Sequence, residues 1–137
     1  MSLLTGQRNE SGPLQLTLEA RPEYAHLLRD RLRMWLEQAG ATKTEVFEVL
    51  LAATEAFTNA VRHPQEATNR LVEITGSITD QTVSVSIRDY GTWKPEQTRK
   101  QGGGMGLPLI EHLMDAVRVE CLLDGTTVTM RRHLAMH

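Results

Sequence analysis

The stretch Thr54-Glu55-Ala56-Phe57-Thr58-Asn59-Ala60-Val61-Arg62-His63 sets a carboxylate, Glu55, and a carboxamide, Asn59, four residues apart. Residues at this spacing project from the same face of a helix. Their neighbours are small or apolar, so the carboxylate needs a partner, a metal ion or a chemical task. We expect Asn59 to offer its amide oxygen to Mg²⁺ and Glu55 to accept a proton. A solvated helix face is the ordinary alternative.

Asp89 and Gly91 follow an alternating strand pattern in Ile87-Arg88-Asp89-Tyr90-Gly91. A carboxylate here can accept a hydrogen bond from the exocyclic amine of adenine, which guanine does not present at that position. A glycine two residues later lets the backbone pass close to a base. Both residue types are also common in turns, so a strand-ending turn is the alternative interpretation.

The run Gly102-Gly103-Gly104-Met105-Gly106-Leu107 opens a predicted helix. Free backbone N–H groups at a helix N-terminus bind phosphate. No Lys-Ser/Thr pair follows, which excludes a Walker loop, and the run comes too late in the chain for a Rossmann fingerprint. A flexible loop is the alternative. Together with the two preceding motifs, the run suggests a nucleotide site.

Length and composition are those of an ordinary globular chain. The 137 residues favour one domain, which we expect over 14–137 behind a loose tail at 1–13. The net charge of −2, without a dense basic stripe, argues against direct nucleic-acid binding. No apolar run approaches the ~20 residues of a membrane span, and no signal peptide is present. Cys121 is predicted to be a buried thiol, and a reducing cytoplasm is the expected compartment.

Hydrophobic periodicity gives the order of the secondary structure. Thr42 and Glu45 form a capping-box pattern, and Asp124-Gly125 is a hairpin turn. The predicted elements are a strand at 14–18, helices at 22–40 and 42–62, strands at 71–78 and 83–87, a helix at 105–116, and strands at 117–121 and 126–130. Two hairpins require antiparallel pairing. We therefore expect an α+β fold, a two-layer α/β sandwich with a mixed, mostly antiparallel sheet and helices on one face.

Four motifs in order resemble the boxes of the GHKL ATPases, a superfamily that includes gyrase and the histidine kinases. They are Glu55-x-x-x-Asn59-Ala60, Asp89-x-Gly91, Gly102-x-Gly104-x-Gly106-Leu107 and Gly125-Thr126. The likeness covers roughly residues 14–132. Within this superfamily, the chain is most similar to the bacterial anti-sigma-factor serine/threonine kinases. The features that carry this likeness are the short chain length and the stretches Ala60-Val61-Arg62-His63 and Gly125-Thr126-Thr127-Val128.

The resemblance implies the Bergerat, or histidine-kinase-like, fold around ATP and Mg²⁺. It implies a kinase that phosphorylates an anti-anti-sigma factor and also sequesters a sigma factor. By motif, Glu55 is the base, Asn59 the Mg²⁺ ligand, Asp89 the adenine contact and Gly91 the lining of the base pocket. Thr126 supports the adenine contact. The phosphate lid and helix start would be formed by Gly102, Gly104, Gly106 and Leu107.

Two departures from the family pattern keep other functions open. Trp93 stands where the Asp-x-Gly-x-Gly box has its second glycine, and the lid lacks a clear phosphate-contacting arginine, although Arg99 or Lys100 could substitute. A non-catalytic ATP-binding regulatory module, or a domain excised from a phosphatase or sensor fusion, is the main alternative. The ATPase half of a histidine kinase is disfavoured, because no helix pair with a phospho-acceptor histidine precedes the domain. A homodimer through the helix that carries Trp35 and Leu36 is a further expectation.

Overall fold

The computed structural model describes residues 12–62, 70–91 and 106–135. Five strands, three α-helices and one short 3-10 helix are formed by this part of the chain. In order they are β2 (Leu14–Glu19), η2 (Pro22–Tyr24), α1 (Ala25–Gln38), α2 (Lys43–Arg62), β3 (Leu71–Thr79), β4 (Thr82–Asp89), α4 (Gly106–Leu113), β5 (Ala116–Leu122) and β6 (Gly125–His133).

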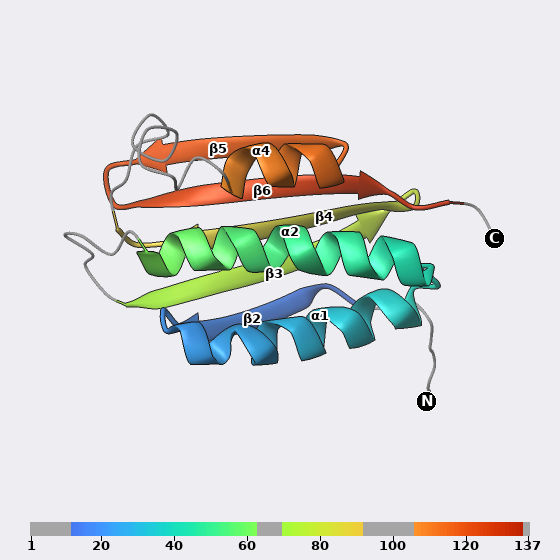
Figure 1. Cartoon of the computed structure of the whole chain (residues 1–137), viewed down its shortest axis with the longest axis horizontal. Coiled ribbons are helices and arrows are strands. Elements are labelled where there is room, and N and C mark those ends of the chain that lie inside the picture. The colour runs from blue at the N-terminus through green and yellow to red at the C-terminus, as the bar shows by residue number, and fades with distance from the viewer. Residues whose placement is uncertain (1–11, 63–69, 92–105, 136–137) are drawn as a thin grey trace.

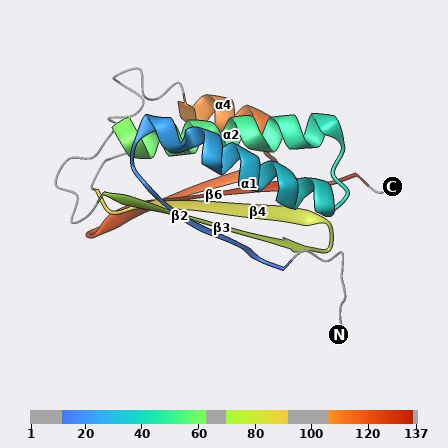
Figure 2. The same ribbon diagram turned by 90° about the horizontal axis from the view of Figure 1, so that it is seen from below.

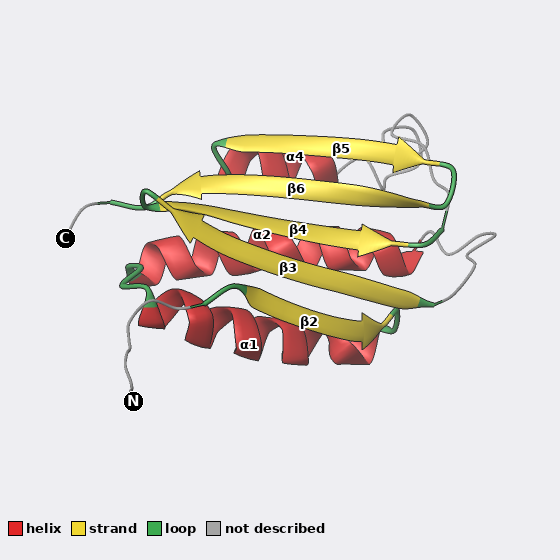
Figure 3. Ribbon diagram, turned by 180° about the vertical axis from the view of Figure 1, so that it is seen from behind, coloured by secondary structure: helices red, strands yellow, loops and turns green. Residues whose placement is uncertain are grey.

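The described elements form two layers. The strands make one sheet in the order β2-β3-β4-β6-β5, and every neighbouring pair in it is antiparallel. The three α-helices of the described residues lie on one face of this sheet, and none of them lies on the other face (Figure 2). Figure 3 shows that bare face from behind, with the helices visible between and beyond the strands. The predicted α+β sandwich is confirmed.

Strand alternation determines which side chains enter the core. In β4, Val83, Val85 and Ile87 are buried, whereas the intervening residues are only partly buried. Successive strand residues point to opposite faces, so the apolar set packs under the helices and the polar set lines the bare face. The hairpin between β3 and β4 turns at Asp80 and Gln81, which have φ angles of 51° and 64°. Two residues with positive φ are typical of the turn type that matches strand twist.

The predicted capping box begins helix α2. The backbone N–H of Thr42 donates to Glu45 Oε1 at 2.8 Å, and the N–H of Glu45 donates to Thr42 Oγ1 at 3.1 Å. The other carboxylate oxygen of Glu45 accepts the N–H of Ala135 at 2.6 Å. The buried carboxylate of Glu45 therefore accepts a free backbone N–H group at the start of α2 and also an N–H group of the chain that follows β6.

Trp35 joins α1 to the sheet through a glycine. A Cβ atom at Gly76 in β3 would lie 2.8 Å from the Trp35 ring, so the indole occupies the space that a side chain would fill. The indole Nε1 donates to the carbonyl oxygen of Gly12 at 2.8 Å. Trp35 is 6% exposed and Leu36 is fully buried, so both side chains belong to the core.

Three sequence predictions need correction. Cys121 is exposed, because it lies near the end of the edge strand β5, beyond the partly buried Val117 and Val119 that pack against the core. The last helix ends at Leu113 rather than 116, since Ala116 already pairs with Arg131 in the sheet. The first helix opens with a 3-10 turn at Pro22–Tyr24 before α1 proper.

Candidate functional site

Asn59 is the most unusual polar residue of α2. Its side chain is fully buried, and neither Oδ1 nor Nδ2 has a hydrogen-bond partner within the described parts of the chain. Leaving a buried polar group unpaired costs roughly 1–3 kcal/mol, so such a group calls for an explanation. A ligand that is absent from the structure would supply one. An amide oxygen of this kind fits a shared Mg²⁺ site, because hard cations take oxygen ligands.

Glu55 lies one turn before Asn59 on the same helix. It is half-buried, in contrast to the complete burial of Asn59. Helix α2 packs against α1, α4 and β4, which leaves little of its surface to solvent. A half-buried carboxylate keeps access to an arriving substrate while remaining next to a dry interior. Such exposure is compatible with a general base, which must come within hydrogen-bond reach of the proton that it takes.

Asp89 and Thr126 lie side by side at the end of β4 and the beginning of β6. They are paired residues in the β4–β6 ladder, and both are buried, at 5% and 1% exposure. Asp89 Oδ1 accepts the backbone N–H of Gly91 at 3.0 Å, which fixes the turn that follows β4. Thr126 Oγ1 is buried and has no hydrogen-bond partner in the described chain. A carboxylate and an unpaired hydroxyl therefore lie together on the helix-covered face.

Gly125 has a structural role that sequence reasoning did not assign. A Cβ atom at this position would collide with the carbonyl oxygen of Asp89 and would lie 3.2 Å from Cα of Tyr90. The absence of a side chain thus lets the β5–β6 turn pack directly on the end of β4. The sequence signal was present in the Gly125-Thr126 box, but no local pattern links position 125 with Asp89.

The described part of the glycine box lies at the start of α4. Gly106 is the first residue of this helix, and Leu107 is buried in the core at 5% exposure. Leu107 thus anchors the helix start in the core. Gly102, Gly104, Trp93, Arg99 and Lys100 lie outside the described residues, so the predicted lid stays a prediction.

These residues gather at one end of the molecule. The carboxyl-terminal half of α2, the end of β4 and the beginning of β6 lie at the same end of the sandwich (Figure 1). Helix α4 packs against α2 in the same layer. Among the described residues, no group of three or more His, Cys, Asp or Glu side chains could cage a metal ion. A cation at Asn59 would therefore take its other ligands from water or from a bound phosphate.

A network of polar side chains behind this site also escaped sequence reasoning. On the bare face of the sheet, the Tyr90 hydroxyl donates to Glu73 Oε2 at 2.7 Å, and Arg88 Nη2 lies 3.2 Å from Asp124 Oδ2. The signal that could have found it is strand alternation, which turns Arg88 and Tyr90 away from Asp89.

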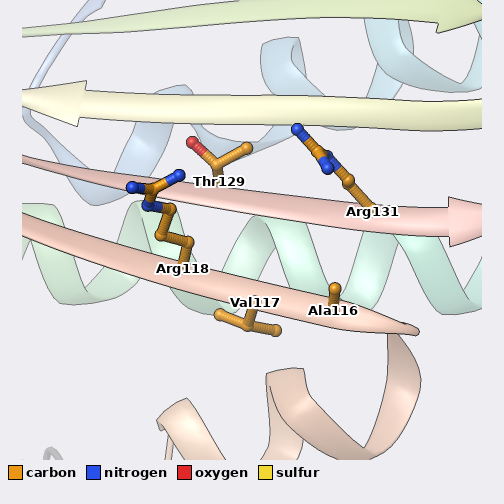
Figure 4. Close-up of a pocket in the computed structure, with 5 residues that line it drawn as sticks. All are labelled: Ala116, Val117, Arg118, Thr129 and Arg131. Carbon is orange, nitrogen blue, oxygen red and sulfur yellow. The ribbon is translucent and has the colours of Figure 1, made fainter.

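One shallow cavity, of about 210 Å³, lies away from the predicted site. It is formed on β5 and β6 near the Ala116–Arg131 pair. Figure 4 shows Arg118 and Arg131 on either side of Thr129, while Val117 points to the opposite side of the strand. The cavity contains none of the predicted site residues.

Comparison with known proteins identifies the kind of domain to which this geometry corresponds. Residues 18–132 match the family described as histidine kinase-like ATPase domain. No helix in the described residues has the length and apolar character needed to span a bilayer.

Two curated relatives align with most of the chain. The serine-protein kinase RsbW of Bacillus subtilis is 32% identical over 143 residues, which cover 93% of this chain and 89% of that protein. The anti-sigma F factor of Geobacillus kaustophilus is 33% identical over 144 residues, covering 93% and 94%.

Two solved structures have the same fold. A Mycobacterium tuberculosis chain with RsbU and RsbW domains is 29% identical, with a TM-score of 0.76 over 91% of this chain and 33% of that longer chain. The structure of the SiaB–SiaC complex from Pseudomonas aeruginosa matches at 13% identity, with a TM-score of 0.61 over 87% of this chain and 88% of the other. The second likeness concerns the fold alone.

Proposed function

Because this chain belongs to the histidine kinase-like ATPase domain family, we propose that it is an ATP-dependent protein serine/threonine kinase and anti-sigma factor. Its protein substrate would be an anti-anti-sigma factor, and its second partner a sigma factor. The four-motif resemblance predicted this family correctly. The proposal places the protein in the cytoplasm, where a sigma factor meets RNA polymerase.

The choice of partners is supported by the names of the relatives. Proteins named serine-protein kinase RsbW and anti-sigma F factor align with about nine-tenths of the chain. This chain covers 33% of the Mycobacterium tuberculosis chain, which is therefore about three times as long. We therefore do not infer partners or activity from that larger protein. The proposed partners come from the two relatives of similar length.

ATP would lie across the end of the helix-covered face. Asp89 would accept a hydrogen bond from the adenine amino group, Gly91 would line the base and Thr126 would support the contact. The buried pairing of Asp89 with Thr126 supports this assignment, since both side chains enter the same space. The phosphates would lie toward the glycine box, which comprises Gly102, Gly104, Gly106 and Leu107.

The observation that supports the nucleotide site is the amide of Asn59, which is fully buried and has no hydrogen-bond partner among the described residues. We assign its oxygen as the protein ligand of a Mg²⁺ ion shared with the phosphates of ATP. When bound, the ion would neutralise charge on the transferring phosphoryl group. The two-carbon side chain of Asn59 fits this task because its oxygen can bind a cation without bringing a second charge into the core.

Glu55 would act as the general base for phosphoryl transfer. Its carboxylate would take the proton of the substrate serine hydroxyl as that oxygen attacks the γ-phosphorus. The bond from the γ-phosphorus to its bridging oxygen breaks, ADP leaves and phosphoserine forms. Proton transfer of this kind contributes roughly 10²–10⁴-fold to rate. The half-buried position of Glu55 supports the assignment, because the serine must come from a partner protein in solvent.

The test is transfer of radiolabelled phosphate from ATP to a candidate anti-anti-sigma factor. Glu55→Gln should keep ATP binding, measured by calorimetry, and should lose roughly 10²-fold or more of the transfer rate. Glu37→Gln is the matched control, because Glu37 is an exposed carboxylate near the end of α1. It should transfer phosphate at the wild-type rate.

Two outcomes would reject parts of this proposal. Undiminished transfer by Glu55→Gln would remove Glu55 as the base. If the wild-type protein binds ATP and a sigma factor but transfers no phosphate to the partner, the non-catalytic regulatory module is the better description. Analytical ultracentrifugation of the wild-type chain would measure its mass in solution and so test whether it forms the expected homodimer.

A further inference from the structure

Asp89 is flanked on both sides by residues that project to the opposite face of the sheet. Asp89 enters the helix-covered side, whereas Arg88 and Tyr90 are partly buried on the bare side. This follows from strand alternation. The geometry of the proposed adenine contact therefore depends on how the strand end is held from behind.

Tyr90 attaches this strand end to β3. Its hydroxyl donates to Glu73 Oε2 at 2.7 Å, and Glu73 is the register partner of Arg88 in the β3–β4 ladder. Hydrogen bonds to a charged acceptor are short and about twice as strong as neutral ones. The carboxylate of Glu73 also raises the pKa of Tyr90 by accepting this hydrogen bond, which keeps the phenol protonated and able to donate.

Arg88 attaches the same strand end to the turn before β6. Its guanidinium carbon lies 4.7 Å from the centre of the Tyr90 ring, within the range of a cation–π contact. Its Nη2 lies 3.2 Å from Asp124 Oδ2, and its side chain is 30% exposed. Asp124 immediately precedes Gly125, whose backbone contacts Asp89 and Tyr90, and Thr126, which pairs with Asp89.

We propose that Tyr90 and Arg88 are positioning residues for the base pocket. The chain of contacts from Glu73 through Tyr90 and Arg88 to Asp124, here called the rear brace, links β3, β4 and the β5–β6 turn. It holds the Asp89 carboxylate and the Thr126 hydroxyl in the relative placement that adenine requires. The inference rests on the proposed function, because it concerns the same nucleotide site.

The physical reason is that base recognition is more sensitive to placement than folding is. A binding side chain must be held within about 0.5 Å of its productive position by a supporting layer of contacts. The apolar core already secures the strand, since Ile87 and Val128 are buried register partners next to the brace. The brace adds polar contacts among four side chains outside the proposed base pocket. Loosening the brace should therefore reduce the preference for ATP over GTP more than it reduces the unfolding free energy.

The test compares Tyr90→Phe with wild type. Phe keeps the ring under Arg88 and removes only the hydroxyl. We expect ATP affinity, measured by calorimetry, to fall about threefold to tenfold, the effect of one lost hydrogen bond. The preference for ATP over GTP should fall by a similar factor. Affinity for Mg²⁺-tripolyphosphate, which has no base, should stay at the wild-type value. Glu73→Gln keeps an acceptor for Tyr90 and should largely retain the preference.

Thr82→Val is the matched control. Thr82 lies on the same strand and face, and its hydroxyl hydrogen-bonds His133 Nδ1 at 2.9 Å at the far end of β4. Losing that bond should leave the ATP to GTP ratio unchanged. The rear brace is rejected if Tyr90→Phe keeps the wild-type ratio, or if tripolyphosphate affinity falls in parallel with ATP affinity. If wild type itself does not prefer ATP to GTP, the proposed base contact fails and the brace with it.

Discussion

The backbone of Gly125 packs directly against the carbonyl group of Asp89, and no Cβ atom fits between them. The contact joins the two strands that carry the proposed adenine contacts, because Asp89 and Thr126 are register partners. The missing side chain of Gly125 thus determines how closely the end of β4 and the beginning of β6 approach each other.

Gly125→Ala should impair folding and nucleotide binding together. The new methyl group meets backbone rather than a flexible side chain, so the strand ends must separate, and overpacking of this kind costs about 1–3 kcal/mol of unfolding free energy. Because Asp89 would be displaced, the variant should also bind ATP more weakly. Urea unfolding and calorimetry measure the two effects.

Gly76→Ala provides the control for this prediction. Its Cβ atom would lie 2.8 Å from the Trp35 ring, so it should also destabilise the fold. Gly76 lies under α1, away from the Asp89–Thr126 pair, and its variant should bind ATP normally once folded. Equal loss of ATP affinity in both variants would mean that the Gly125 effect is only a loss of stability.

Asp89→Asn should make ATP binding weaker by more than ~1 kcal/mol, because the lost hydrogen bond is charge-assisted. The asparagine oxygen can still accept the Gly91 N–H, so the turn should survive and the unfolding free energy should change little. Affinity for GTP should be poor in both proteins. Equal ATP affinity in variant and wild type, by calorimetry, would reject Asp89 as the base-reading residue.

Asn59→Leu should separate function from stability. Leucine has a similar volume and removes two buried polar atoms that have no partner in the described part of the chain. The nucleotide-free protein should therefore keep or gain about 1 kcal/mol of unfolding free energy. Mg²⁺-dependent ATP binding should be lost. The check is denaturant unfolding without nucleotide, followed by ATP titration with and without Mg²⁺.

A matched apolar change at a paired polar residue should behave in the opposite way. Thr42→Val removes the capping hydroxyl that accepts the Glu45 N–H, and loss of a cap costs about 1 kcal/mol. ATP affinity should be unaffected, because Thr42 begins α2 at the end far from Asn59. If Asn59→Leu instead destabilises the nucleotide-free protein strongly, Asn59 has a structural partner and is no ligand.

The Tyr90–Glu73 hydrogen bond predicts a change of stability in alkaline solution. Acceptance by Glu73 raises the pKa of Tyr90 above the ordinary value of 10.0, because the protonated phenol is favoured in the folded state. The stabilisation is therefore complete below pH ~10 and is lost as the pH rises through the folded pKa. As the pH rises above about 10 and through the folded pKa, the unfolding free energy of wild type should fall more steeply than that of Tyr90→Phe. Parallel curves would contradict the linkage.

Most of the elements could be predicted because their signals are local. The Thr42–Glu45 capping box, the Asp80-Gln81 turn and the alternation of Val83, Val85 and Ile87 each lie within a few residues. Backbone geometry converts such patterns into helix starts, turns and strand faces without reference to the rest of the chain. The end of the last helix and the exposure of Cys121 were wrong, because both depend on where the edge strand β5 begins and on what covers it.

The sequence by itself determined that Glu55 and Asn59 share a helix face, that Asp89 and Gly91 end a strand, and that the chain has the motifs of its family. Only the tertiary structure decided that Asp89 pairs with Thr126, that both amide atoms of Asn59 are buried with no partner in residues 12–62, 70–91 and 106–135, and that Tyr90 reaches Glu73. Periodicity fixes the direction of a side chain within its own element. The neighbour that it meets depends on strand order and register, which follow from packing all the apolar faces into one core.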